Sequence, residues 1–273
     1  MPLKFSILTP SYNQAPFIEQ TILSVINQPG IEKEHIIMDG DSNDETVAIL
    51  KKYPHLIWVS EKDKGQADAL RKGLKLATGD IVGWLNSDDY YEEGIFESVA
   101  RHFEDPNTMW VIGNLSFVYD DAHQEVVEDI SPQVTYQRLL NNPDIVRQPP
   151  TFFRKKFLLQ AGGWNPDYFM VMDYDLWFRL AKQSTPKMVN ETWAYFRMHS
   201  LQKTSHANIL RQSREINQLL KREHVGLSIR FGIRVRKRSH WLKGIIKSGL
   251  IGAGLLDKRY QSRPVRLKSR GSE

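Results

Sequence analysis

The sequence predicts an α/β fold in which helices flank a mixed, mostly parallel β-sheet, followed by a helical, basic tail. Two observations lead to this prediction. Apolar runs of strand length alternate with segments of helical spacing four times over roughly the first 85 residues, which is typical of βαβ units. A polar cluster follows each apolar run, and parallel sheets bind their ligands beyond the carboxyl ends of the strands.

The four predicted strands are short and apolar. They cover residues 5–9, 35–38, 56–59 and 81–85. Apolar residues three or four positions apart predict a helix after each of the first three strands. Pro10 begins a segment that is expected to end the first strand. Lys64-Gly65 starts the helix after the third strand, and Gly79 stops it.

The pattern changes after residue 90, where strands no longer alternate regularly with helices. A helix is expected around 96–103, strands at 110–114 and 193–198, a hairpin of 117–119 with 125–127, and helices from 172 and over 208–223. Pro149-Pro150 interrupts a further strand within 146–154. We expect one domain over residues 1–205, with a nucleotide-binding half over about 1–90 and an acceptor half over about 91–205.

The residues after the first strand exclude two glycine-loop nucleotide folds. A dinucleotide-binding oxidoreductase needs a Gly-x-Gly-x-x-Gly turn at that point, but the sequence reads Thr9-Pro10-Ser11-Tyr12-Asn13-Gln14. A Gly-x-x-x-x-Gly-Lys-Ser/Thr loop is also absent from the sequence. The charge of a bound phosphate would therefore have to be met by a metal ion.

Two adjacent carboxylates, Asp88 and Asp89, directly follow the fourth predicted strand. Like charges this close raise each other's pKa, and a hard divalent cation such as Mg2+ or Mn2+ relieves the repulsion and takes oxygen ligands. The alternative is that the acidic pair belongs to a solvated turn or caps the next helix.

The composition is that of a soluble globular protein, with 41% hydrophobic and 25% charged residues. The lack of cysteine excludes a disulfide framework and a thiolate metal site, and it fits a reducing cytosol. No signal peptide precedes the first strand, and no apolar segment reaches the roughly 17–25 residues that span a bilayer. We therefore expect a cytoplasmic protein.

The ordered set of motifs resembles the family-2 glycosyltransferases of the GT-A fold, a Rossmann-like fold, over about residues 4–205. The motifs are residues 9–13, residues 39–46, residues 79–80 with 86–89, residues 172–177, and Arg197-Met198-His199. The resemblance implies an inverting enzyme with a nucleotide-sugar donor, most simply a UDP-sugar, a divalent metal and an acceptor hydroxyl. It also implies a role in polysaccharide or glycolipid biosynthesis, with a glycan or lipid-linked glycan as acceptor.

The resemblance also assigns site residues. The general base is Asp173, although the family usually has Glu-Asp where this chain has Met172-Asp173, and Asp175 is an alternative base. The metal ligands are Asp89 and His199. The residues expected at the nucleotide are Thr9, Pro10, Ser11, Tyr12, Asp39, Gly65, Arg71, Ser87 and Asp88. Structural roles stay open for several of them: Asp173 could cap a helix, Arg71 could be a solvated charge, and His199 could be merely structural.

The tail over residues 206–273 differs in charge from the rest of the chain. Residues 225–273 hold 13 Lys and Arg against 2 acids, a net charge of +11, so the remainder carries −6. Trp241 and the apolar residues that follow it at helical spacing suit an amphipathic helix on an anionic membrane surface. Nucleic acid and a plainly solvated end are the alternatives, and we favour peripheral binding to the cytoplasmic face of a membrane.

A function from another class stays open beside the enzyme. A non-catalytic protein that binds nucleotide-sugars, or a membrane scaffold on the same fold, would lack the acid at position 172 as this chain does. Donor cleavage with and without Mn2+ separates the two hypotheses.

Overall fold

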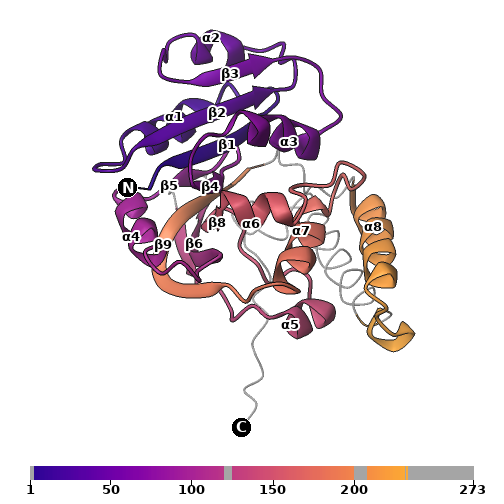
Figure 1. The fold of residues 1–273 in the computed structure, drawn as a ribbon. Coiled ribbons are helices and arrows are strands. Elements are labelled where there is room, and N and C mark those ends of the chain that lie inside the picture. Colours follow the sequence, from indigo (N-terminus) through magenta and orange to yellow (C-terminus); the bar gives the residue numbers. More distant parts are fainter. Residues whose placement is uncertain (1–2, 120–124, 200–207, 231, 233–273) are drawn as a thin grey trace. The chain divides into compact units, whose positions relative to one another are not determined.

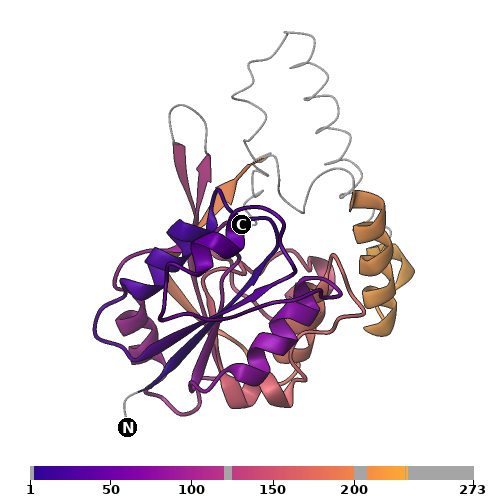
Figure 2. The same cartoon turned by 90° about the horizontal axis from the view of Figure 1, so that it is seen from above.

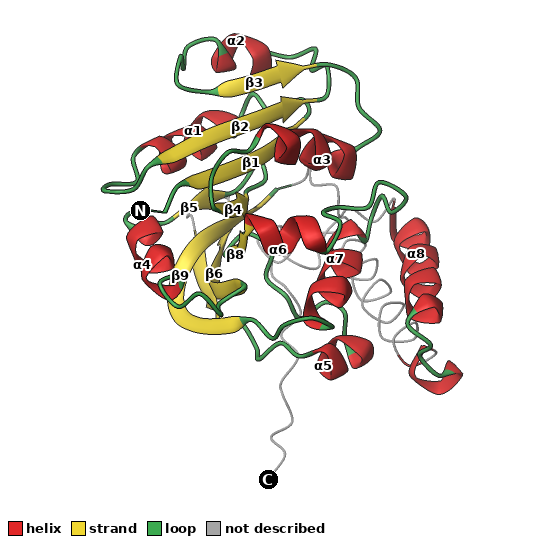
Figure 3. Ribbon diagram, viewed as in Figure 1, coloured by secondary structure: helices red, strands yellow, loops and turns green. Residues whose placement is uncertain are grey.

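A computed structural model describes residues 3–119, 125–199, 208–230 and 232 (Figure 1). The chain forms two compact units. The first comprises Met1–Val118 with Val126–Arg197, and the second comprises Tyr119–Glu125 with Met198–Glu273. The predicted fold class is confirmed for the first unit, where helices flank a mixed sheet (Figure 3). Of the predicted tail over residues 206–273, residues 206–207, 231 and 233–273 lie outside the described residues, as do residues 200–205 and the tip of the predicted hairpin.

Nine strands form one sheet in the described part of the chain, in the order β3-β2-β1-β4-β8-β6-β9-β5, with β7 paired to β6. Their bounds are β1 Phe5–Ser11, β2 Lys33–Asp39, β3 Ile57–Ser60, β4 Ile81–Trp84, β5 Tyr90–Tyr91, β6 Trp110–Tyr119, β7 Glu125–Asp129, β8 Thr151–Arg154 and β9 Lys187–Met198. The first four strands are parallel to one another. The pairs β4–β8, β6–β8 and β5–β9 are antiparallel.

The order of the first four strands has a switch point at β1. The chain runs from β1 outward to β2 and β3, and then returns to place β4 on the other side of β1. The crossovers on the two sides of a switch point diverge, so the carboxyl ends of β1 and β4 are where an open α/β sheet accepts a ligand. This position is the one that the sequence predicted for the nucleotide.

Eight helices occur among the described residues: α1 Ile18–Ile26, α2 Thr46–Leu50, α3 Gln66–Leu76, α4 Ile95–His102, α5 Tyr136–Asn141, α6 Lys155–Gln160, α7 Met172–Ala181 and α8 Ile209–Arg222. The helices α1 and α3 cover opposite faces of the parallel strands (Figure 2). Ile37 of β2 packs with α1 and α2, whereas Met38 packs against Gly73 of α3. Consecutive strand residues point to opposite faces, so β2 is buried on both sides and reads as a continuous apolar run.

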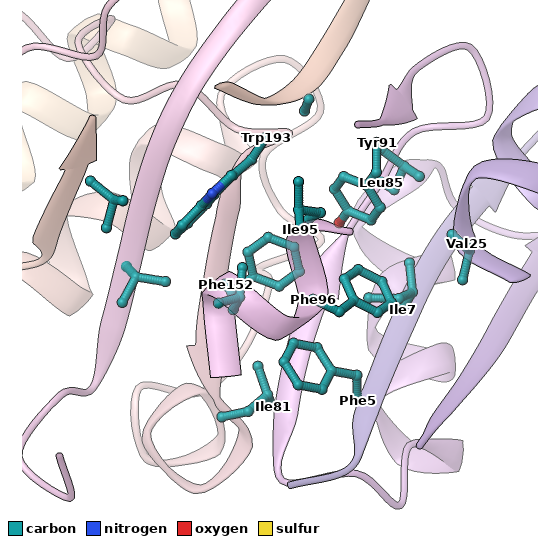
Figure 4. Packing of buried hydrophobic residues seen from close by; sticks show 14 of the residues in the cluster. Phe5, Ile7, Val25, Ile81, Leu85, Tyr91, Ile95, Phe96, Phe152 and Trp193 are labelled. Carbon is teal, nitrogen blue, oxygen red and sulfur yellow. The ribbon is translucent and has the colours of Figure 1, made fainter. Parts of the chain in front are cut away.

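An aromatic cluster forms the core where the parallel and antiparallel strands meet (Figure 4). The rings of Phe5 and Phe96 stack with centroids 5.0 Å apart, and Phe152 meets both of them edge-on at 6.1 Å. Phe152 also contacts Trp193 of β9 at 6.0 Å. Aromatic pairs of this kind stabilise a core beyond their buried area, so these rings hold the two halves of the sheet together.

The structure corrects the expected end of the first strand. Pro10 was expected to end it, but β1 continues through Pro10 to Ser11. The carbonyl of Ser11 accepts a hydrogen bond from Gly40 on the β2 side, so the nitrogen of Pro10 points to the β4 side. Pairing with β4 ends at Leu8, and the missing N–H of Pro10 therefore leaves no ladder bond unmade.

The strand expected within residues 146–154 begins only at Thr151. The chain turns just before it, because the amide of Thr151 bonds to the carbonyl of Gln148 over 3.1 Å. Pro149 and Pro150, which have no N–H, occupy that turn. The short strand β5 and the helix α5 were not predicted from the sequence. No helix in the described ranges is long and apolar enough to cross a membrane.

Candidate active site

Three strand ends lie side by side at the carboxyl edge of the parallel strands. Ser11 of β1 is in register with Asp39 of β2, and Asp39 is in register with Ser60 of β3. The carboxylate of Asp39 is 1% exposed and accepts hydrogen bonds from the Ser42 amide (2.9 Å), the Ser42 hydroxyl (2.5 Å) and the Ser60 hydroxyl (2.7 Å). Asp39 therefore holds the loop after β2 in place from within the protein.

A glycine in that loop leaves space between two side chains. A Cβ on Gly40 would lie 3.1 Å from Oδ2 of Asp63 and 3.5 Å from the ring of Tyr12. The Tyr12 side chain is 59% exposed, which is unusual for an aromatic residue beside a packed sheet. An exposed ring next to a carboxylate offers a stacking surface and a hydrogen-bond acceptor to a planar ligand.

The helix α3 starts at the same edge of the sheet. Its N-cap residue is Gly65, with φ at +108°, and a Cβ there would lie 3.3 Å from the ring of Phe169. The amide of Gly65 bonds to Asp63, and Gln66 in the first turn donates to Oδ1 of Asn86 over 2.7 Å. The left-handed backbone at Gly65 thus brings the amino end of α3 next to the segment that follows β4.

Asn86, the second residue after β4, makes four hydrogen bonds with its side-chain amide. Its Oδ1 accepts from Gln66 and from Nε1 of Trp84 (2.9 Å). Its Nδ2 donates to Oδ2 of Asp89 (3.2 Å) and to Oε1 of Gln148 (2.9 Å). An amide has two donor hydrogens and two acceptor lone pairs, so Asn86 uses its full capacity. It joins α3, the acidic residues and the segment before β8.

The acidic residues differ in exposure. Asp88 is partly exposed, whereas Asp89 is 1% exposed. Burial, followed by the charge of Asp88, raises the pKa of Asp89 well above its usual value, although hydrogen bonds from Arg197 and Asn86 act in the other direction. The ionised form of Asp89 is therefore disfavoured, and a cation bound beside it would lower the pKa again.

Two side chains from other elements fix the backbone of this acidic segment. The hydroxyl of Thr21 on α1 lies 3.0 Å from the carbonyl of Ser87 and 2.7 Å from that of Asp89. Nε of Arg197 on β9 donates to the carbonyl of Asp88 over 3.2 Å. The Ser87 and Asp89 carbonyls thus share the single hydroxyl hydrogen of Thr21, and the Asp88 carbonyl between them is held by Arg197.

Arg197 itself is 8% exposed and is packed between aromatic rings. Its guanidinium carbon lies 5.2 Å from the ring centroid of Phe17 and 5.5 Å from that of Tyr90. Its Nη2 donates to Gln20, and its backbone amide donates to Asp89 over 3.2 Å. Arg197 therefore ties α1, the acidic segment and β9 together at one point.

Asp173 lies in the first turn of α7 and is partly exposed. The next residue, Tyr174, is 6% exposed, and its hydroxyl donates to Oδ1 of Asp144 over 2.5 Å. Asp175 is fully buried and forms an ion pair with Arg179 at 2.6 Å. Of the two acids considered as a base, Asp173 is the more accessible one, and Asp175 is engaged in holding its own helix.

The family model for "Glycosyl transferase family 2" matches residues 6–163, which is more than half of the chain. The chain belongs to glycosyltransferase family 2.

Relatives and solved structures extend this result. Protein MT1568 of Mycobacterium tuberculosis is 28% identical over 199 residues, covering 66% of this chain and 62% of that protein. The Escherichia coli UDP-Glc:alpha-D-GlcNAc-diphosphoundecaprenol beta-1,3-glucosyltransferase WfgD is 29% identical over 199 residues, covering 68% of this chain and 72% of its own length. The chain thus spans about three fifths of the length of the first of these relatives.

The fold matches that of a solved mannosyltransferase. The mannosyltransferase PcManGT from Pyrobaculum calidifontis, in complex with GDP-Man and Mn2+, superposes with a TM-score of 0.60 and 18% identity, covering 96% of this chain and 83% of that chain. At this identity the likeness concerns the fold.

The structure gathers most of the predicted nucleotide residues of this glycosyltransferase at the ends of β1 to β4. Ser11, which is 6% exposed, has an Oγ without a hydrogen-bond partner among the described residues. Thr9 is 1% exposed, and its hydroxyl pairs with Nε2 of His35 over 2.9 Å, so it faces the interior. Pro10 is buried next to it, and Arg71 is exposed on α3. His199 belongs to the second unit, and its assignment stays a prediction.

The donor set of the acidic segment fits a divalent cation. It consists of two carboxylates, one partly exposed and one buried with a raised pKa, and hard cations prefer such oxygen ligands. Within the described ranges, no group of three or more His, Asp or Glu side chains gathers around one point.

Sequence reasoning missed several residues that shape this site. Thr21 gave no signal, because a threonine in a helix is common, and Asn86 lies in the motif of residues 86–89 but was assigned no role of its own. Arg197 lies in the motif Arg197-Met198-His199 without an assigned role, although an arginine inside the apolar strand of residues 193–198 needs a reason to be buried. Its partners are far away in the sequence, and only the fold identifies them.

Proposed function

We propose that this family-2 glycosyltransferase moves a sugar from a nucleotide-sugar, with UDP as the preferred nucleotide, to the hydroxyl of a glycan or lipid-linked glycan, inverting the anomeric carbon. Support comes from the family and from WfgD, whose name describes a UDP-glucose donor and a diphosphoundecaprenol-linked acceptor. The single observation that carries the proposal is the acidic segment held by Asn86, Thr21 and Arg197 at the switch point of the sheet.

The nucleoside lies, in this proposal, across the ends of β1 and β2. The ring of Tyr12 stacks on the base, and the free hydroxyl of Ser11 meets a polar atom of the base or ribose. Asp39 acts by holding the loop that contains Gly40, because its oxygens already accept bonds from Ser42 and Ser60.

The diphosphate lies between the amino end of α3 and the acidic segment. The positive end of the α3 dipole and its first amides favour an anion there, and Gly65 lets the backbone approach. A bound Mn2+ or Mg2+ supplies Lewis-acid stabilisation of the leaving diphosphate. Asp88 and Asp89 would hold this cation, Asp88 from the exposed side.

Asp173 takes the proton from the acceptor hydroxyl. The hydroxyl oxygen forms a bond to the anomeric carbon while the bond to the diphosphate oxygen breaks, and the diphosphate leaves with that electron pair. A carboxylate is a weak base in water, but the hydroxyl becomes acidic as the new bond forms, so a base held within reach suffices. Met172, which is 3% exposed, packs in the core and takes no part in this step.

The proposal extends to the organisation of the whole chain. Residues 1–205 form the glycosyltransferase domain, and the basic residues of 206–273 bind an anionic membrane on its cytoplasmic face, close to a lipid-linked acceptor. The charge of +11 over residues 225–273 supports this part of the proposal.

The test combines binding and turnover on the full chain. Release of UDP or GDP from UDP-glucose, UDP-N-acetylglucosamine and GDP-mannose is measured with Mn2+ and with EDTA, for the wild type and for Asp173→Asn. We expect Mn2+-dependent release from a UDP-sugar and a loss of about 100-fold or more in kcat for Asp173→Asn, with UDP binding kept. A wild-type chain that binds UDP but cleaves none of these donors would support the non-catalytic alternative instead.

A further inference from the structure

The segment from Asp144 to Gln148, between α5 and β8, touches the site at both of its ends. At its carboxyl end, Oε1 of Gln148 accepts from Asn86, and its Nε2 donates to the carbonyl of Trp84 over 2.5 Å. Because Asn86 also donates to Asp89, this end of the segment is one side chain away from the buried acid.

At the amino end of the segment, Asp144 receives the hydrogen bond from the buried hydroxyl of Tyr174. Tyr174 follows Asp173 directly in the first turn of α7, so a bond to its side chain fixes the orientation of that turn. The end of α7 that carries the proposed base is therefore anchored to a loop, in addition to its own packing.

The segment between these two ends is itself well fixed. Ile145 and Val146 are buried, at 7% and 9% exposure. The carbonyl of Arg147 accepts from the Thr151 hydroxyl over 2.7 Å. Four residues span at most about 14 Å, so the segment is a short connection whose central side chains are buried.

Burial and the nearby carboxylates keep the hydroxyl of Tyr174 protonated. Burial, then the charges of Asp144 and Asp173, raise the pKa of Tyr174 well above its usual value, and Arg147 acts weakly in the other direction. The hydroxyl is therefore protonated at neutral pH and can act as the donor to Asp144.

We propose that Asp144 and Tyr174 are positioning residues for Asp173, and that the segment 144–148 sets the distance between this base and the acidic residues after β4. The inference rests on the proposed function. It makes the hydrogen bond between Tyr174 and Asp144 necessary for the full catalytic rate, although neither side chain touches the reacting atoms.

The test uses three variants of the full chain and one matched control. Tyr174→Phe removes the donor, Asp144→Ala removes the acceptor, and Asp144→Asn keeps an acceptor oxygen while removing the charge. Tyr53→Phe removes a phenol–carboxylate bond of the same kind, from Tyr53 to Glu19 at 2.9 Å, and neither of these residues has a proposed part in the site. Release of UDP from UDP-glucose and UDP-N-acetylglucosamine in Mn2+ gives kcat, calorimetry gives the Kd of UDP, and melting gives Tm.

We expect Tyr174→Phe and Asp144→Ala to lower kcat about 10-fold while the Kd of UDP stays within twofold of wild type, a loss of about 1.4 kcal/mol in the transition state alone. Asp144→Asn should retain at least half of the wild-type kcat, and Tyr53→Phe should retain all of it. Wild-type kcat in Tyr174→Phe, an Asp144→Asn enzyme as slow as Asp144→Ala, or a loss of UDP binding in step with kcat would each overturn the inference. A wild-type chain that binds UDP but releases none contradicts the proposed function, and the inference falls with it.

Discussion

The backbone amide of Arg197 donates a hydrogen bond to the carboxylate of Asp89 across 3.2 Å and joins two residues 108 positions apart in the chain. The side chain of Arg197 makes further bonds to the Asp88 carbonyl and to Gln20. The acidic segment of the site is thus positioned by the last strand of the sheet.

Arg197→Lys should weaken the site more than it weakens the fold. Lysine keeps the positive charge, but its single ammonium group cannot bond to Asp88 and Gln20 in the fork geometry of a guanidinium. We expect UDP to bind about 10-fold less tightly in Mn2+, a change of about 1.4 kcal/mol, as measured by calorimetry.

Arg154→Lys is the matched control for this variant. Arg154 also directs its guanidinium at backbone carbonyls, those of Phe103, Asp105 and Thr108, and lies over the ring of Phe103. It should lower Tm and leave the affinity for UDP unchanged. Equal UDP affinity in Arg197→Lys and in the wild type would show that the acidic segment holds its conformation without the guanidinium.

Asp88→Asn and Asp89→Asn should both remove the effect of Mn2+ on UDP binding, because each takes away one carboxylate of the proposed cation site. Only the change at Asp89, which is 1% exposed, should also alter Tm by more than about 2 °C. Calorimetric titrations of UDP with Mn2+ and with EDTA measure the effect. Asp80→Asn, at an exposed acid before β4, is the control and should keep the full Mn2+ response.

Gly65→Ala should destabilise the protein and weaken nucleotide binding together. A side chain at φ +108° is strained by about 1–3 kcal/mol, and the new methyl group would press on Phe169 at 3.3 Å. Gly94→Ala is the comparison, since Gly94 has φ +75° with open space around its Cβ position. Thermal melting should show a larger loss for Gly65→Ala, and only this variant should raise the Kd of UDP. Unchanged UDP binding in Gly65→Ala would remove the amino end of α3 from the proposed diphosphate site.

Two neighbouring residues of β2 should make the protein sensitive to acid. Burial, with a smaller effect of the charge on His55, lowers the pKa of His35 to about 3. Burial would raise the pKa of Glu34, but hydrogen bonds from Ser6 and Thr78, with a smaller one from Lys4, outweigh it and lower the pKa to about 2. Both pKa values lie below those of the unfolded chain, so both groups stabilise the fold at neutral pH and lose this contribution as the pH falls.

The pH windows of the two groups differ. His35 loses its contribution as the pH falls from about 6.5 towards 3, and Glu34 loses its contribution below about 4.5, each by about 1 kcal/mol per pH unit. Denaturant unfolding measured from pH 7 to pH 3 should show a slope that steepens below pH 4.5. His35→Gln should flatten the upper part of this curve, and Glu34→Gln the lower part. A free energy of unfolding that is constant from pH 7 to pH 5 in the wild type would contradict the role of His35.

Much of the parallel half could be predicted, because its signals are local. A buried strand reads as a continuous apolar run, and the polar cluster that follows it marks a ligand edge, as with Asp39 after β2 and the acidic pair after β4. The unpredicted parts depend on contacts between distant residues. Pro10 looks like a strand breaker until its neighbours show that its nitrogen faces no partner strand.

The different surroundings of the two acids could not be read from the sequence either. Asp88 and Asp89 are chemically identical neighbours, and their difference in burial comes from Arg197 of β9 and from Asn86. The bond between Tyr174 and Asp144 likewise joins residues 30 positions apart, and no spacing rule identifies it.

The late position of Arg197 in the chain has a consequence for synthesis. A ribosome releases the parallel strands well before it releases β9, and chains emerge at about 5–20 residues per second. Arg197 is therefore synthesised several seconds after Asp88 and Asp89, and its hydrogen bonds to them can form only then. During that interval a nascent chain can form its parallel strands while the acidic segment still lacks its hydrogen bonds from Arg197.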